Sequence, residues 1–95
     1  SLTNGADCSG FVMSVFANFG YSLPRVAAAQ CEASTKKDIS QLEPGDLVFY
    51  GSGYIDHVTL YIGDGKIIHA SNAATGIKIS DYDYEKPAAV GTFME

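Results

Sequence analysis

The stretch Asp7-Cys8-Ser9-Gly10-Phe11-Val12 places a thiol at the point where a polar, turn-forming segment becomes an apolar helix. Beyond it, bulky apolar residues recur at helical spacing as far as Phe19, so one face of residues 8–19 can be buried. Gly20 then follows as a helix stop. The pattern therefore predicts an amphipathic helix that starts within this stretch.

Cys8 occupies a position in this helix that suits a reactive thiol. We expect Asp7 to be the N-cap, which would put Cys8 in the first helical turn. Unpaired backbone N–H groups and the positive end of the helix dipole favour a thiolate there, and the thiolate is the nucleophilic form of cysteine. The alternative interpretation is that Cys8 is simply a small buried residue.

The length and composition of the chain limit what it can be. Ninety-five residues, of which 46% are hydrophobic and 18% charged, indicate one globular domain over residues 1–95. The net charge of −5 argues against nucleic acid as a partner, because phosphate binding needs clustered Lys and Arg. No apolar run approaches the roughly 20 residues that span a bilayer, so we expect no membrane span in this chain.

The remainder of the chain changes from helical to strand-like sequence. Good helix formers after Pro24 predict a second helix over residues 25–34, and the polar residues 35–41 are expected to be open. The sequence predicts a buried strand at 47–50, a β-hairpin of 57–62 with 66–70, weaker strands at 77–79 and 89–93, and a loop at 81–86. Because the helices precede the strands, we expect an α+β fold with helices packed on one side of an antiparallel sheet.

Both histidines of the chain lie in the predicted hairpin, so its register decides whether they can act together. A two-residue loop at 64–65 would point the two imidazoles to opposite faces. A three-residue loop at 63–65 would set His69 opposite Thr59 and make His57 and His69 diagonal neighbours on one face, within about 8 Å. This second register also sorts the apolar residues well, and we favour it.

The face that carries both histidines is where we expect the helix bearing Cys8 to dock. A thiolate beside one imidazole, itself oriented by a second polar group, is the arrangement that nucleophilic cysteine catalysis requires. His57 stands at a strand start and is the better placed to reach the thiol. We therefore assign Cys8 as the nucleophile, His57 as the base and His69 as the orienting residue.

Other interpretations of these residues remain open. The histidines could be solvent-facing or satisfied core residues, and Cys8, His57, His69 and Asp56 could form a zinc site, although the close-spaced ligand pairs of structural zinc sites are missing. Cys31 could pair with Cys8 in a disulfide. If Cys8 is catalytic, Cys31 is instead expected to be a small packed residue.

Five short motifs follow one another along the chain and together resemble a known family. They are Asp7 to Val12, Leu23-Pro24-Arg25, Pro44 to Phe49, His57-Val58 with Tyr61-Ile62-Gly63, and Ile68-His69-Ala70. In these motifs, which cover residues 6 to about 72, the chain resembles the NlpC-type bacterial cell-wall cysteine peptidases.

The resemblance implies a papain-like fold in which the helix carrying Cys8 packs against a sheet carrying His57 and His69. It implies a secreted, cell-wall-associated enzyme without a cofactor. Such an enzyme hydrolyses peptidoglycan stem peptides, usually between γ-linked D-glutamate and a diamino acid. It further implies that Asp7 and Ser9 shape substrate binding and that the Cys8 backbone N–H contributes to the oxyanion hole.

Relatives usually have a tyrosine and a Trp-Gly-Gly-like run before the Asp-Cys-Ser-Gly motif, where this chain has only residues 1–6. We therefore expect a catalytic domain that is truncated at its N-terminus and belongs to a longer secreted protein with a further wall-binding domain. Two other functions remain open. One is a catalytically impaired wall-binding module of the same fold, and the other is acyl or amide transfer by the same Cys–His pair.

Overall fold

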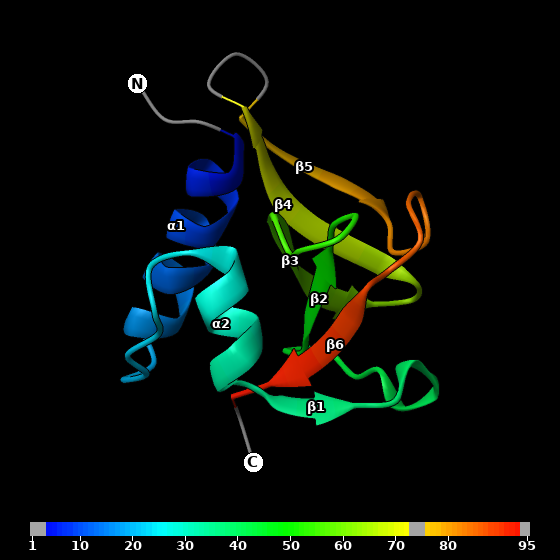
Figure 1. Cartoon of the computed structure of the whole chain (residues 1–95), viewed down its shortest axis with the longest axis horizontal. Helices are drawn as coiled ribbons and strands as arrows, with labels where there is room; N and C mark the ends of the chain where they lie inside the picture. Colours follow the sequence, from blue (N-terminus) through cyan, green and yellow to red (C-terminus); the bar gives the residue numbers. More distant parts are fainter. Residues whose placement is uncertain (1–3, 73–75, 94–95) are drawn as a thin grey trace.

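A computed structural model describes residues 4–72 and 76–93 of the chain. The elements, in order, are helices α1 (Asn4–Ala17) and α2 (Ala27–Ala33), strand β1 (Thr35–Lys37), the short 3₁₀ helix η1 (Ile39–Gln41), and strands β2 (Leu47–Tyr50), β3 (His57–Gly63), β4 (Lys66–Asn72), β5 (Gly76–Asp81) and β6 (Ala89–Thr92). The strands form one antiparallel sheet in the order β1-β6-β2-β3-β4-β5, and both helices lie on one side of it (Figure 1). The predicted α+β architecture is confirmed.

Helix α1 begins earlier than the sequence indicated. It starts at Asn4, so Asp7 lies inside the helix and is not its N-cap, and Cys8 is in the second turn. Phe19 lies beyond the helix and is 73% exposed, so the expectation that it belongs to the buried face is wrong. The buried hydrophobic residues of the described part of α1 are Cys8, Val12 and Phe16, which are spaced four residues apart.

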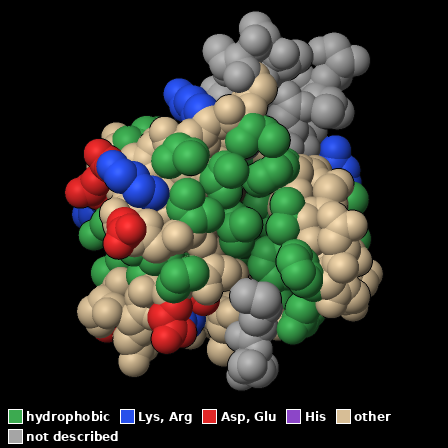
Figure 2. Space-filling view, turned by 180° about the vertical axis from the view of Figure 1, so that it is seen from behind, with side chains coloured by type: hydrophobic (Ala, Val, Ile, Leu, Met, Phe, Trp, Pro, Cys, Tyr) green, Lys and Arg blue, Asp and Glu red, His purple; other side chains and the backbone are tan. Residues whose placement is uncertain are grey.

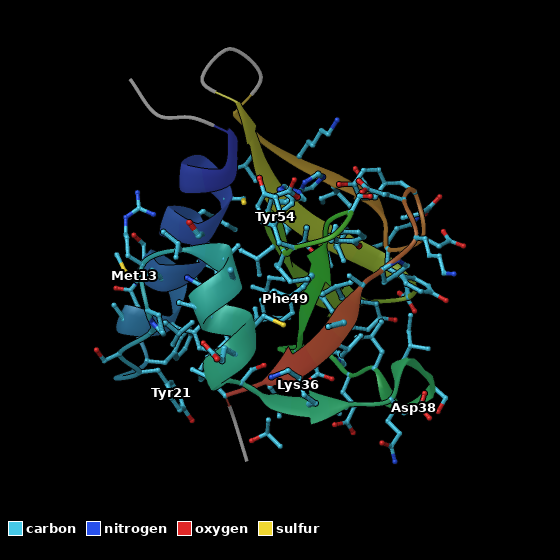
Figure 3. The ribbon with its side chains drawn as sticks, viewed as in Figure 1. Met13, Tyr21, Lys36, Asp38, Phe49 and Tyr54 are labelled. Carbon is cyan, nitrogen blue, oxygen red and sulfur yellow. The ribbon has the colours of Figure 1, made fainter. Side chains whose placement is uncertain are left out.

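Two groups of buried side chains lie on opposite faces of the sheet, because neighbouring residues of a strand point to opposite sides. The helix-side cluster consists of Cys8, Val12, Phe16, Leu23, Ala27, Cys31, Leu47, Phe49 and Val58. The outer cluster consists of Val48, Tyr50 and Ile67, with Leu42, Tyr61 and Tyr82 packed against it. Figure 3 labels Phe49 between β2 and the helices. Strand β2 contributes to both clusters, which explains its uninterrupted apolar sequence.

The hairpin of β3 and β4 combines features of the two registers considered above. Its turn is the two-residue loop, because Gly63 pairs with Lys66 and both Asp64 and Gly65 have positive φ angles, of 57° and 74°. A β-bulge between Tyr61 and Gly63 then shifts the pairing by one residue. The predicted three-residue loop is therefore wrong, while the register that it was meant to produce, with Leu60 opposite Ile68, is present.

Strand β1 was not anticipated, since its sequence is polar. Thr35–Lys37 pairs with β6, with Thr35 opposite Thr92, and forms one edge of the sheet. Strand β2 has the predicted bounds, and helix α2 and strands β5 and β6 are present with ends displaced by one or two residues.

One face of the molecule carries many hydrophobic side chains, as Figure 2 shows in the view from behind. An apolar groove is lined by Val15, Phe16, Phe19, Gly45 and Leu60. No helix within residues 4–72 and 76–93 is long and apolar enough to cross a membrane.

Candidate active site

Cys8 is brought to the start of β3 by the packing of α1 on the sheet. Its side chain is 0% exposed and belongs to the helix-side cluster. The backbone N–H of Val58 donates a hydrogen bond to Cys8 Sγ at 3.4 Å. Val58 directly follows His57 in the chain, so the sulfur is held at the backbone position next to that histidine.

The environment of Cys8 favours the neutral thiol. Burial raises the pKa of the Cys8 thiol above its ordinary value, and nearby Asp56 raises it further, whereas backbone N–H groups of Val58 and Ser9 lower it. The sequence-based expectation of a thiolate stabilised at a helix start is therefore wrong. The main physical reason is burial, which disfavours the charged thiolate. In addition, Cys8 lies beyond the first helical turn, where the helix dipole mainly acts.

The early start of α1 also affects the proposed oxyanion donor. In an α-helix only the first four N–H groups lack an intrahelical acceptor, and Cys8 is the fifth residue of α1. Its backbone N–H therefore falls within the hydrogen-bonding pattern of the helix. This geometry argues against the Cys8 N–H as the oxyanion donor in this conformation.

The two histidines lie against each other, as the favoured register predicted. His57 Nε2 is 2.9 Å from His69 Nδ1, and the ring centroids are 5.1 Å apart in an edge-to-face arrangement. On its other side, His69 Nε2 is 3.1 Å from Ser80 Oγ on β5. His69 is only 3% exposed, so protein atoms provide the partners of its ring.

Both imidazoles favour the neutral form. Burial lowers the pKa of His57, although Asp56 acts in the opposite direction. Burial also lowers the pKa of His69 to about 4, helped by the neighbouring His57 and Lys78. A neutral imidazole can accept a proton, so His57 has the protonation state that a general base needs at neutral pH.

The helix carrying Cys8 does not dock on the face that was expected. Strand β2 pairs Tyr50 with His57 and Phe49 with Val58, so His57 shares its face with the outer cluster. Helix α1 packs on the opposite face, against Val58 and the other residues of the helix-side cluster. The thiol and the imidazoles therefore approach the start of β3 from opposite sides of the sheet.

Two tyrosines surround the histidines, and sequence reasoning missed both. The ring centroids of Tyr50 and His57 are 5.8 Å apart. The ring centroid of Tyr84 is 5.5 Å from that of His69 and 5.3 Å from that of Tyr50. Tyr84 is 48% exposed, and burial of its phenol together with nearby Glu85 raises its pKa to about 12. Tyr84 lies in the segment expected to be a loop, where its spacing carried no signal of a contact with His69.

Ser9 lies in the interior, on the side of α1 that faces the segment before α2. Its side chain is fully buried, and its hydroxyl accepts a hydrogen bond of 3.1 Å from Arg25 Nη1. Gln30 Nε2 donates to the Ser9 carbonyl at 3.1 Å. This burial argues against a direct contact between the Ser9 side chain and a substrate. Asp7 is in α1, and its side chain lies outside the described residues.

The second cysteine and the zinc interpretation can also be compared with the structure. Cys31 is a buried thiol in the helix-side cluster, as expected of a packed residue, and no disulfide joins it to Cys8. Within the part of the chain that the structure describes, no group of three or more His, Cys, Asp or Glu side chains is arranged to hold a metal ion.

The chain matches the model of the NlpC/P60 family over residues 1–92. It is 48% identical over 90 residues to a probable endopeptidase p60 of Listeria innocua. This match covers 93% of this chain and 18% of the relative. It is 40% identical over 89 residues to the γ-D-glutamyl-L-lysine dipeptidyl-peptidase of Bacillus subtilis, which covers 86% of this chain and 30% of that protein. The chain thus spans less than a third of the length of these relatives.

Solved structures show the same likeness. The peptidoglycan hydrolase RipB of Mycobacterium tuberculosis superposes with a TM-score of 0.85 and 36% sequence identity over 94% of this chain and 45% of that chain. RipD of the same organism, described as a non-catalytic NlpC/p60 domain protein adapted to peptidoglycan binding, superposes with a TM-score of 0.83 and 25% identity over 93% of this chain and 67% of that chain. From the family match and these similarities, the chain belongs to the NlpC/P60 family and has its papain-like fold.

Proposed function

We propose that this chain is the catalytic domain of a cysteine endopeptidase that hydrolyses peptidoglycan stem peptides in the bacterial cell wall. The observation that carries the proposal is the arrangement at the start of β3. The sulfur of Cys8 accepts a hydrogen bond from the backbone N–H of Val58, the residue after His57. His57 is in turn hydrogen-bonded to His69. The same three residues occupy the motif positions that led to the family.

In the first half of the reaction, Cys8 Sγ attacks the carbonyl carbon of the scissile amide. Because Nε2 of His57 faces His69, Nδ1 is the nitrogen that takes the thiol proton as the new S–C bond forms. His57 then gives this proton to the amide nitrogen, the C–N bond breaks, and the amine leaves. The acyl group remains on Cys8 as a thioester.

In the second half, water attacks the thioester carbonyl and His57 accepts a proton from that water. The C–S bond breaks, and the proton returns to the sulfur of Cys8. In both halves His57 carries a positive charge for part of the step, and His69 Nδ1 accepts the hydrogen bond from its Nε2–H. This contact keeps the ring in place and stabilises the imidazolium.

For the bond that is cut, we propose the amide between γ-linked D-glutamate and the diamino acid that follows it. Support comes from the name of the Bacillus subtilis relative, a γ-D-glutamyl-L-lysine dipeptidyl-peptidase. The cell-wall substrate places the action of the protein outside the cell membrane. We also propose that the full protein carries a further wall-binding domain, since the curated relatives are several times longer than this chain.

Mass spectrometry of muropeptides after digestion tests the activity. Purified peptidoglycan is incubated with the chain, with Cys8→Ala, and with Cys31→Ala as the matched cysteine control. The proposal expects release of new soluble peptides by the wild type and by Cys31→Ala, and no release by Cys8→Ala. Equal release by Cys8→Ala would overturn the assignment of the nucleophile.

A second candidate is a non-catalytic module that binds peptidoglycan, as RipD is described to do. The full burial of Cys8 and its raised thiol pKa favour this candidate, because both reduce the reactivity of a cysteine. Binding of soluble stem peptides without any release of cleaved product, with equal affinity in wild type and Cys8→Ala, would support it over the peptidase.

A further inference from the structure

A serine on the edge strand of the sheet contacts His69 on the side of its ring that faces away from His57. Ser80 belongs to β5, which pairs with β4, and its Oγ is 3.1 Å from His69 Nε2. Ser80, His69 and His57 thus form one row of hydrogen bonds across three strands. None of the motifs in the sequence singles out Ser80, which lies in a weakly patterned strand.

The hydrogen bonds of this row can run in two directions. The two directions differ in whether Nδ1 of His57 carries a proton. In one direction His57 Nε2–H donates to His69 Nδ1 and His69 Nε2–H donates to Ser80 Oγ, so Nδ1 of His57 is unprotonated. In the other direction each donor is reversed, and the proton of neutral His57 sits on Nδ1. A histidine with its proton on Nδ1 cannot accept the proton of the Cys8 thiol at that atom.

The positive charge that forms during the reaction selects the first direction. Once His57 is an imidazolium, both of its nitrogens are donors, so His69 Nδ1 has to accept. The proton of His69 is then on Nε2. Because His69 is only 3% exposed, this N–H needs a protein acceptor, and Ser80 Oγ is at the right distance.

We propose that Ser80 is a positioning residue that accepts a hydrogen bond from His69 Nε2–H and thereby holds His69 in the tautomer that orients His57 as the base. The inference rests on the proposed function for the role of His57, whereas the tautomer of His69 can be observed without any reaction. The charged and titratable groups around the pair are Asp56 before β3, Tyr50 on β2, Lys78 on β5, and Tyr84 after β5.

The first test is nuclear magnetic resonance of the ¹⁵N-labelled histidines in the whole chain, in a Cys8→Ala background where no turnover occurs. The expected result is protonated Nε2 and unprotonated Nδ1 on His69. In Ser80→Ala the two tautomers of His69 should become mixed, and Ser80→Thr, which keeps the hydroxyl, should restore the wild-type spectrum. A proton on His69 Nδ1 in the parent chain, or an unchanged spectrum in Ser80→Ala, would overturn the proposal.

The second test is the pH dependence of stem-peptide hydrolysis in Cys8-containing chains. Ser80→Ala is expected to lower kcat about tenfold with little change in KM, in line with the loss of one buried hydrogen bond. It should also move the acidic limb of the profile to lower pH, because the imidazolium of His57 is less well stabilised. Ser80→Thr should recover most of the rate, and Ile77→Ala on the same strand serves as the control. Parallel pH profiles in wild type and Ser80→Ala would contradict the inference.

The two tests separate the two proposals. If the wild type releases no peptide but the His69 tautomer depends on the Ser80 hydroxyl, the proposed function fails and the positioning role of Ser80 stands. If hydrolysis depends on Cys8 while the tautomer is independent of Ser80, only the inference about Ser80 fails.

Discussion

The two faces of the sheet hold the two halves of the site by different means. On the helix side, Cys8 is one member of a dry cluster of aliphatic and aromatic residues, and Val58 N–H donates a hydrogen bond to its sulfur. On the outer side, His57 and His69 are fixed by hydrogen bonds and ring contacts with Ser80 and tyrosines. Packing positions Cys8, the proposed nucleophile, whereas polar contacts position His57, the proposed base.

The largest effect is expected from removing the proposed base, His57, on the outer face. His57→Gln keeps a polar side chain of similar size but cannot shuttle a proton at neutral pH, so kcat for stem-peptide hydrolysis should fall about 10²- to 10⁴-fold. The free energy of unfolding should change little, which denaturant titration can confirm. If the variant kept more than about a tenth of the wild-type rate, the loss would be smaller than a general base accounts for, and the role of His57 would be contradicted.

On the helix side, the largest loss should be of stability. Phe49 is fully buried in the helix-side cluster, so Phe49→Ala should lower the free energy of unfolding by about 3–5 kcal/mol in urea titration. Phe19→Ala removes the same side chain from a position that is 73% exposed and should cost less than about 0.5 kcal/mol. Equal losses in the two variants would show that the helix-side cluster is not the core.

Acid should destabilise the outer face through its histidines. The pKa of His69 is lowered to about 4, so folding favours its neutral form, and stability present above an unfolded pKa of about 6.5 is lost as the pH falls towards 4. The loss from this residue is on the order of 3 kcal/mol. Subtracting the pH–stability curve of His69→Gln from that of the wild type isolates it, and a flat difference between pH 7 and 4 would contradict the burial argument.

The smallest effect concerns the exposed edge of the outer face. The ring of Tyr84 packs on His69, and its phenol, with a pKa of about 12, stays neutral at physiological pH. Tyr84→Phe keeps the ring and should change kcat/KM by less than about threefold, while Tyr84→Ala removes the ring contact and should lower it by up to about tenfold. Equal kinetics of the two variants would show that the ring contact does not position His69.

Local sequence patterns predicted most of the elements, because apolar spacing and turn residues are properties of neighbouring residues. Strand β1 could not be predicted in this way, since polar Thr35–Lys37 becomes a strand only by pairing with β6, more than 50 residues further along the chain. The β-bulge near Tyr61 explains why a two-residue turn can coexist with the register of a longer loop. Hairpin patterns do not encode such an inserted residue.

The candidate site was predictable where its residues lie in motifs and not where they come from elsewhere in the fold. The sequence motifs predict Cys8, His57 and His69 as site residues, and the structure brings the two imidazoles together as expected. Ser80 and Tyr84 reach His69 from β5 and the segment after it, which only the sheet order reveals. The charge state of Cys8 was wrong because it depends on where α1 begins and on burial, neither of which the local sequence determines.

We propose that Cys8 enters the reaction as a buried neutral thiol and passes its proton to His57 only as it attacks. The pH dependence of Cys8 alkylation tests this claim most directly. The measurement uses Cys31→Ala, so that Cys8 is the single thiol, and follows iodoacetamide modification by mass spectrometry. Because burial raises the pKa of the Cys8 thiol, the account predicts a rate that rises with a midpoint above the ordinary thiol value of about 8.5. A midpoint below pH 7, which would indicate a preformed thiolate, would contradict it.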